Sequence, residues 1–512
     1  MTTKYNVVAN VLGRVWGALV SFAFVPLYVR FMGVEGYGLI GFFTSMLAVF
    51  FMLDMGLSLT LNRELARLGP DPEERATART LLRTLESIYW VIGLAICAII
   101  VFAAPTIATR WLNVGHLPLD ETVHAVRLMG LVAMFRWPVA LYTGGLMGLR
   151  RHVILNAITS TFATLQGGGA VLILWLVSPT VTAFFLWQVG VAFLQIVVLI
   201  AVTWRSIPLS RHRARFGRAA LRSVAAFSAG ITGITLLSAV LTQLDKFLLS
   251  KLLPLEQFGY YSMAAAIAGL LVPVGGAIYS AVFPVFSAMV ARDEHDQLEA
   301  IYHKSCQLLS VLIIPVAVVI VFFSNDLLAL YLRDPKIVAG VSLLLKLQIV
   351  GNALLALVLL PVGLQFAFGW TKLSFYKNVV AVIFYVPLLF LMVSRFGAPG
   401  AAGVWIMVTA GYFLIEIQIM HRYVLHGHQW RWYFVDVGIP AAVSIAVVGA
   451  MRALVGPTMP WLAKLALIGT AGALALGISM VLLPGTRDLL ASALATGGRL
   501  RRSFLARGRA NG

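Results

Sequence analysis

Residues 204–222 read WRSIPLSRHRARFGRAALR, and this basic stretch divides the chain into two long apolar parts. It has no acidic residue and six arginines: Arg205, Arg211, Arg213, Arg215, Arg218 and Arg222. Lys and Arg gather in the cytoplasmic loops of membrane proteins. We therefore expect a cytoplasmic loop of an integral membrane protein here, rather than an arm that binds nucleic acid.

The composition of the whole chain also indicates a membrane protein. Hydrophobic residues make up 60% of the 512 residues and charged residues only 12%, whereas a soluble domain has about 25% charged residues. The net charge of +19 lies mostly in the predicted cytoplasmic segments, which predicts contact with membrane lipid and no nucleic-acid partner. Cys97 and Cys306 lie apart in apolar segments, so neither a disulfide nor a metal site is expected. The predicted fold class is therefore an all-α, polytopic membrane protein.

About fourteen segments reach the roughly 20 apolar residues that a transmembrane helix needs. Their approximate limits are residues 10–30, 39–61, 84–104, 122–148, 153–177, 181–203, 224–250, 260–288, 305–325, 339–364, 378–396, 400–421, 434–455 and 461–484. Lys and Arg are concentrated in alternate connections, which places both termini in the cytoplasm. All connections are short, and this disfavours membrane glycosyltransferases and polymerases, whose chemistry uses larger external loops.

A weak internal repeat predicts how the helices are grouped. Residues 30–43 (RFMGVEGYGLIGFF) align with residues 251–264 (KLLPLEQFGYYSMA), and a constant offset of 221 pairs Arg30 with Lys251, Glu35 with Glu256, Tyr37 with Phe258 and Gly38 with Gly259. Two parallel six-helix lobes would place a substrate path between them. The predicted organisation is a lobe at 1–204, the basic loop at 205–222, a lobe at 223–425, helices 13 and 14 at 426–484, and a basic cytoplasmic tail at 485–512.

Arg136 is the first candidate for a binding residue, because ionisable side chains deep in a membrane are costly and usually functional. It lies about fourteen residues into the predicted span 122–148, beyond easy reach of either surface. Pro138 should open the helix beside it. A guanidinium offers a planar fork that suits phosphate. We therefore expect Arg136 to bind an anion, and the alternative is a structural pair with a buried carboxylate such as Asp54.

Four further cations complete the predicted substrate-binding set. Arg127, Lys246 and Lys346 lie nearer the external face, where each side chain could instead extend to the surface. Arg14 lies at the depth of the inner leaflet. The three glycines at 167–169 are candidate hinges, although close helix packing would explain them equally well.

Two acids are candidates for ion coupling or gating. Asp54 shares its depth with Arg14 on the adjacent span, so the pair is either a structural salt bridge or a coupling pair. Asp245 is the sequence neighbour of Lys246, and the two point in different directions on a helix. We expect no catalytic residue, metal or cofactor, and leave H⁺ or Na⁺ open as the coupling ion.

The first 64 residues carry a family resemblance in three stretches. These are N-x3-N-x3-R ending at Arg14, PLYVRFMGVEGYGL, and DMGLSLTLNRELAR. The positions concerned are Asn10, Arg14, Pro26, Arg30, Gly33, Glu35, Tyr37, Gly38, Asp54, Gly56, Leu57, Arg63 and Glu64. They resemble the polysaccharide-export flippases of the multidrug/oligosaccharidyl-lipid/polysaccharide transporter superfamily. Beyond residue 64 the likeness is one of span count and lobes.

The resemblance implies a fold and a function. It is nearest to bacterial inner-membrane translocases for undecaprenyl-pyrophosphate-linked O-antigen or exopolysaccharide units. It implies alternating access by two six-helix bundles around a cationic lumen, with polysaccharide polymerase or ligase machinery as possible partners. The alternatives are a flippase for lipid-linked peptidoglycan precursor, an ion-coupled multidrug exporter of the same superfamily and, less favoured, a membrane glycosyltransferase or polymerase.

Overall fold

The computed structural model describes residues 16–17, 20, 22–54, 56–67, 72–208, 216–217, 237, 240–456 and 458–487. Within these ranges the secondary structure is helical, apart from one isolated bridge between Asn113 and Pro254. Eleven helical segments of the described chain are long and apolar enough to cross a membrane. The prediction of an all-α, multi-pass membrane protein is confirmed.

The eleven segments correspond to most of the predicted spans. Thr371–Tyr423 contains two of them, 378–396 and 400–421. Helix α15 (Thr371–Gly411) joins this pair across a kink at Gly397, whose φ is 61°. Parts of the predicted spans 10–30 and 224–250, and most of the basic loop 205–222, lie outside the described residues.

Large apolar side chains cover the outer faces of many helices. Phe102 is 84% exposed, Phe384 69% and Trp175 68%. Single exposed apolar residues are normal on soluble proteins, but rows of them along span-length helices are not. These faces contact lipid.

The described chain forms two compact units. The first unit consists of Met1–Ile267 and Phe375–Ala401, and the second unit of Ala268–Ser374 and Ala402–Gly512. These limits differ from those of the two predicted lobes, which stay a prediction.

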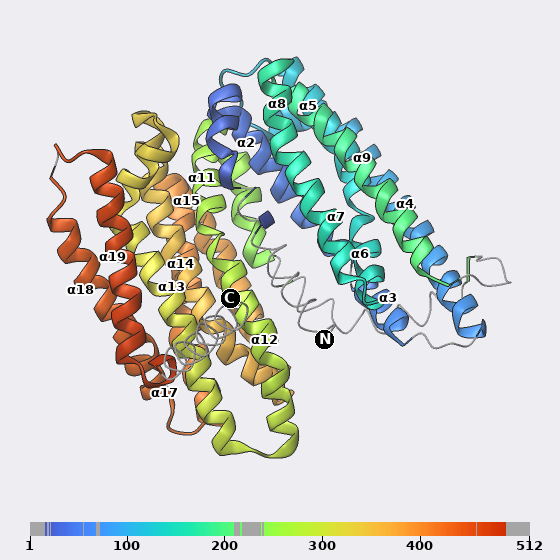
Figure 1. Ribbon diagram of the computed structural model, residues 1–512. Helices are drawn as coiled ribbons and strands as arrows, with labels where there is room; N and C mark the ends of the chain where they lie inside the picture. The colour runs from blue at the N-terminus through green and yellow to red at the C-terminus, as the bar shows by residue number, and fades with distance from the viewer. Residues whose placement is uncertain are drawn as a thin grey trace, which may run out of the picture. The chain divides into compact units, whose positions relative to one another are not determined.

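In the first unit, helix breaks coincide with glycine and proline. Its helices are α2 (Val25–Phe51), α3 (Leu57–Ala66), α4 (Pro72–Thr106), α5 (Leu119–Arg136), α6 (Val139–Gly148), α7 (His152–Thr164), α8 (Ala170–Leu176), α9 (Val181–Ser206) and α11 (Leu255–Ala268). Gly33 interrupts α2 with a φ of 71°, and Gly56 precedes α3 with a φ of 77°. Only glycine adopts such values without strain. Helix α5 packs against both α4 and α9 (Figure 1).

The two copies of the sequence repeat touch each other within the first unit. A Cβ atom on Gly38 would lie 2.7 Å from the carbonyl oxygen of Leu255, and a Cβ atom on Gly259 would lie 2.4 Å from the carbonyl oxygen of Val34. The offset of 221 converts one contact into the other, because it relates Val34 to Leu255 and Gly38 to Gly259. The repeat is therefore structural: its two copies make reciprocal contacts that only glycine permits at these distances.

The second unit is built around α13. Its helices are α12 (Leu271–Arg292), α13 (His295–Leu332), α14 (Pro335–Ala367), α16 (Ile417–Tyr423), α17 (Gln429–Arg431), α18 (Ile439–Ala453) and α19 (Trp461–Leu482). Helix α13 packs against α12, α14, α18 and α19, and α18 lies beside α19 (Figure 1). An apolar core joins α13 to this last pair through Phe323, Val448, Ile468, Ala471 and Ala475.

Candidate functional site

Arg136 lies where a membrane-spanning segment breaks. It is the last residue of α5, and α6 begins at Val139, directly after Pro138. Proline has no N–H to donate and its ring displaces the preceding turn, so the helix cannot continue unchanged through it. The predicted opening of the helix beside Arg136 is confirmed.

Two glutamines contact the Arg136 guanidinium and a third holds one of them, and together the four residues form the Arg136 cluster. Nη2 of Arg136 donates to Oε1 of Gln166 at 2.5 Å and to Oε1 of Gln188 at 3.3 Å. Nε2 of Gln166 donates to Oε1 of Gln195 at 3.0 Å, and Nε2 of Gln188 donates to the carbonyl oxygen of Gln166 at 3.2 Å. Each amide oxygen that faces Arg136 is thereby held in place.

The backbone explains why these glutamines meet. Gln188 and Gln195 are two turns apart on α9, so they share one face. Gln166 belongs to a π turn, η3 (Leu165–Gly169), of the kind that often marks a functional site. A Cβ atom on Gly169 would lie 2.3 Å from the Trp187 ring. Gly169 therefore lets α9 approach this turn closely, and Gly167 lets the ring of Phe24 do the same, so close packing accounts for these two glycines.

The charge of Arg136 is solvated but not neutralised. Among the described residues its hydrogen-bond partners are amide oxygens, which carry only partial charge, and no acid forms an ion pair with it. Its Nε is buried and has no hydrogen-bond partner in the described part of the chain. Arginine has five N–H donors, and the contacts above use Nη2 alone. The site thus holds an oriented cation with donors available for an anion.

Asp54 does not supply the carboxylate that the alternative interpretation of Arg136 requires. It ends a 3-10 turn, η1 (Met52–Asp54), and accepts a hydrogen bond from the hydroxyl of Ser58 at 2.8 Å. The hydroxyl of Tyr89 donates to its other oxygen. Arg14, its predicted partner, lies outside the described residues. The coupling role of Asp54 stays a prediction.

Among the described residues of the first unit, no other predicted cation contacts the Arg136 cluster. Arg127 lies nine positions before Arg136 on α5. This spacing places the two side chains on opposite sides of the helix, and Arg127 is exposed. Nζ of Lys246 donates to the carbonyl oxygen of Thr242 at 3.2 Å. Lys346 is half-buried on α14 and belongs to the second unit. Their binding roles stay predictions.

Asp245 is buried, as its predicted position implies. The hydroxyl of Tyr261 donates to its Oδ2 at 2.5 Å, and its Oδ1 has no partner among the described residues. Its neighbour Lys246 is only half-buried. The two side chains therefore differ in burial, in line with the expectation that they point in different directions.

One cavity of about 270 Å³ lies in the second unit, between α13 and α19. Its acid, Asp326, is paired with Arg452 at 3.0 Å and with Lys464 at 3.3 Å. Most of its remaining lining is apolar. No group of acids, histidines and cysteines in the described residues could hold a metal ion.

The sequence analysis did not identify the glutamines. The available signal was the spacing of Gln188 and Gln195, which are seven residues apart in an otherwise apolar segment. Such spacing places two amides on one helix face. It does not reveal that Gln166 and Arg136, from two other helices, meet that face.

Comparison with known proteins supplies the family and the fold. The family described as polysaccharide biosynthesis protein matches residues 27–335. A Shigella flexneri protein named as an O-antigen transporter is 20% identical over 407 residues, which cover 79% of this chain and 94% of that protein. A Haloferax volcanii protein named as a low-salt glycan biosynthesis flippase, Agl15, is 22% identical over 450 residues, covering 87% and 89%. The solved structure of the lipid II flippase MurJ in an inward closed conformation has a TM-score of 0.69 at 14% identity, over 95% of this chain and 99% of that chain. The last likeness shows a shared fold.

Proposed function

Because the chain belongs to the polysaccharide biosynthesis protein family, we propose that it is a flippase for a lipid-linked oligosaccharide. Relatives named for O-antigen transport and glycan flipping support a transporter. In finer detail, the substrate is an undecaprenyl-pyrophosphate-linked repeat unit of O-antigen or exopolysaccharide, carried from the cytoplasmic to the external leaflet of a bacterial inner membrane. Movement is by alternating access, and both termini lie in the cytoplasm.

The observation that carries this proposal is the unneutralised charge of Arg136. An arginine at the centre of a membrane helix costs about 2.5–3.5 kcal/mol on insertion scales. The amide oxygens of Gln166 and Gln188 reduce that cost without cancelling the charge. An anionic ligand would cancel it. A pyrophosphate suits the site because its oxygens match the spacing of guanidinium donors, and charge-assisted pairs of this kind are roughly twice as strong as neutral ones.

The rival multidrug exporter fits this site less well. A transporter of cationic compounds needs buried acids at its binding site, whereas the Arg136 cluster offers a cation and amides. Lipid-linked peptidoglycan precursor shares the pyrophosphate chemistry, so it remains an alternative substrate. Complementation of strains that lack one or the other flippase distinguishes the two substrates.

The test compares two arginines of the same helix. We expect Arg136→Ala to reach normal abundance but to lose most surface polysaccharide. Arg136→Lys should recover only part of the export, since an ammonium keeps the charge but not the fork. Arg127→Ala is the matched control, because Arg127 is exposed on the opposite side of α5.

Protein abundance and polysaccharide export must be measured in the same cells. Full export by an abundant Arg136→Ala protein would remove the main support for the proposal. Equal loss in Arg127→Ala would show that any charge on α5 matters, and that the Arg136 cluster has no special role.

A further inference from the structure

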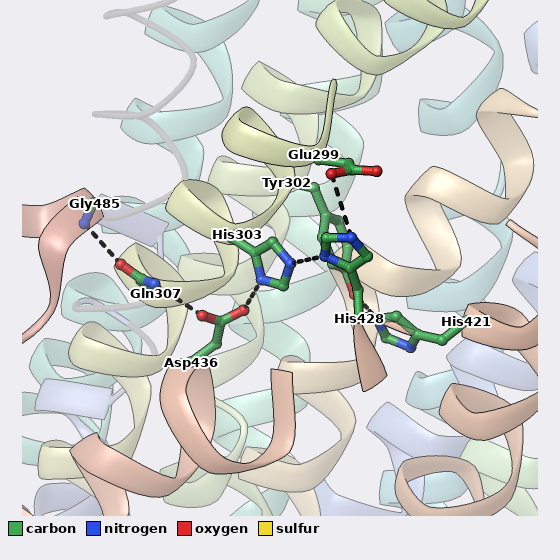
Figure 2. Close-up of polar contacts among 8 residues, drawn as sticks. All are labelled: Glu299, Tyr302, His303, Gln307, His421, His428, Asp436 and Gly485. Carbon is green, nitrogen blue, oxygen red and sulfur yellow. Dashed lines mark hydrogen bonds and ion pairs between the residues drawn. The ribbon is translucent and has the colours of Figure 1, made fainter. Parts of the chain in front are cut away.

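A second polar cluster lies in the second unit, where four titratable side chains form an unbroken line (Figure 2). Oε2 of Glu299 lies 3.3 Å from Nε2 of His428. Nδ1 of His428 lies 2.9 Å from Nε2 of His303, and Nδ1 of His303 lies 2.5 Å from Oδ2 of Asp436. Glu299 and His303 belong to α13, His428 to the turn before α17, and Asp436 to the π turn η5 (Trp432–Gly438). We call these four residues the histidine line.

The line runs from the surface of the unit to its interior. The side chain of Glu299 is 38% exposed and that of His428 is 23% exposed, whereas His303 is 2% exposed and Asp436 is fully buried. A proton from solution can therefore enter at Glu299 and pass along the two imidazoles, because each ring has one nitrogen facing each neighbour.

Counting hydrogens shows how many protons the line holds. It contains two hydrogen bonds, between His303 and Asp436 and between His303 and His428, and one ion-pair contact of 3.3 Å between His428 and Glu299. Each of these three contacts is attractive only when a hydrogen lies between its two atoms. Two ionised carboxylates supply none, and two neutral imidazoles supply two. One further proton is required, on either imidazole or on a carboxyl group. The count holds for every choice of tautomer, so it does not depend on where the hydrogens are placed.

The inner end of the line is fixed. Nε2 of Gln307 donates to Oδ1 of Asp436 at 2.8 Å, and its own Oε1 accepts from the backbone N–H of Gly485 at 2.9 Å (Figure 2). This second contact sets the orientation of the Gln307 amide, so Oδ1 of Asp436 must act as an acceptor. The extra proton therefore cannot rest on that oxygen.

The surrounding titratable groups do not supply the missing hydrogen. They are Tyr302, Cys306 and Tyr433 near Asp436, and His421 beside the histidines. His421 is satisfied as a neutral ring, because Nδ1 lies 2.9 Å from the carbonyl oxygen of Ile417 and Nε2 lies 3.1 Å from the hydroxyl of Tyr302. Within the described chain, Glu299 and Asp436 form ion pairs with histidines alone.

We propose that the histidine line is a binding site for one exchangeable proton. With the proton bound, all three contacts are made, and the four groups carry a net charge of −1. Without it, two lone pairs face each other at one contact. The outermost contact, between Glu299 and His428, then breaks most easily because water can replace it. Proton loss thus removes one of the two contacts that hold His428 to α13, and it loosens the turn at 424–428.

This inference goes beyond the proposed function and is independent of any glycan. It assigns a site for H⁺ in the part of the chain where sequence analysis placed no coupling residue. With the predicted orientation, Glu299 and the turn at 424–428 face the cytoplasm, so the site would exchange its proton with that compartment.

The test is hydrogen–deuterium exchange of the full-length purified protein at about pH 6 and about pH 8, the range in which imidazoles commonly titrate. After correction for the intrinsic exchange rate, we expect the protection of residues 424–433 to fall by about tenfold at the higher pH. Glu299→Gln should abolish this pH dependence while keeping the protection, because the Gln amide can donate to Nε2 of His428. Over the same interval the wild-type protein should release about one more proton than Glu299→Gln.

The control is His421→Gln, which removes a nearby histidine outside the line and should leave the pH dependence unchanged. Three results would overturn the proposal: protection in the wild type that is independent of pH, unchanged pH dependence in Glu299→Gln, or its loss in His421→Gln. Because Glu299 is partly exposed, Glu299→Gln should fold normally. None of these readouts measures transport, so failure here leaves the proposed function standing.

Discussion

The Arg136 cluster and the histidine line stabilise buried ionisable groups in opposite ways. Both place ionisable groups among apolar helices, where an unpaired charge is costly. The histidine line satisfies its carboxylates with titratable rings from the same chain. The Arg136 cluster surrounds its cation with amides that cannot neutralise it. The polar groups of the histidine line are all satisfied once one proton is bound. The charge of Arg136 is neutralised only when an anion binds from outside the chain.

Removal of Asp436 should have the largest effect. Asp436→Ala leaves His303 and Gln307 buried without their acceptor, and breaking a buried ion pair costs about 3–5 kcal/mol. We expect low abundance and a clearly lower thermal midpoint in detergent. Asp436→Asn is the control, because an amide can accept from Gln307 and donate to His303. An Asp436→Ala protein as stable as wild type would show that the line contributes little to the fold.

An acid introduced next to Arg136 should have the next largest effect. Gln188→Glu places a carboxylate where an amide oxygen lies 3.3 Å from Nη2. The new ion pair would satisfy Arg136 internally, whereas the carboxylate loses the hydrogen bond that the Gln188 amide donates to the carbonyl oxygen of Gln166. Because the two effects oppose each other, we expect only a small change in stability. Binding of an anion would weaken by about tenfold or more, because a hydrogen bond to a charged group contributes about 1.5–3 kcal/mol.

The matched variant is Gln188→Met, which removes the amide without adding charge. Export should fall more in Gln188→Glu than in Gln188→Met at equal abundance. The reverse order would contradict the view that the uncompensated charge is the functional property of this cluster.

The smallest effect is expected at Gln195. Its oxygen accepts from Gln166, and in the described structure it forms no hydrogen bond with Arg136. Gln195→Leu loses one neutral hydrogen bond, which contributes about 0.5–1.5 kcal/mol. A thermal-unfolding measurement should show a small decrease, with export largely retained. Loss of export as severe as in Arg136→Ala would indicate that Gln195 itself touches the substrate.

Two of the residues that carry the family resemblance, Glu35 and Gly38, have structural roles. Glu35 is buried and accepts hydrogen bonds from the backbone N–H groups of His116 at 2.9 Å and Leu117 at 3.0 Å. Gly38 permits the close approach of Leu255. The resemblance therefore identified the family without identifying the binding site.

The sequence by itself determined the fold class, most span positions and the helix break beside Arg136. These features depend on local properties: the apolar content of about 20 residues and the missing N–H of proline. The repeat was also visible in the sequence. Each copy needs a glycine at its contact with the other copy, so Gly38 and Gly259 occupy equivalent positions 221 residues apart.

Only the tertiary structure decided which polar groups meet. Arg136 contacts Gln166 and Gln188 from two other helices, and His303 contacts Asp436 from a segment 133 positions away. Side-chain contacts between helices depend on rotation and crossing angle, which hydropathy and spacing do not encode. Burial depth could be read from the sequence, and it singled out Arg136. The sequence does not reveal whether a buried charge has a partner within its own chain.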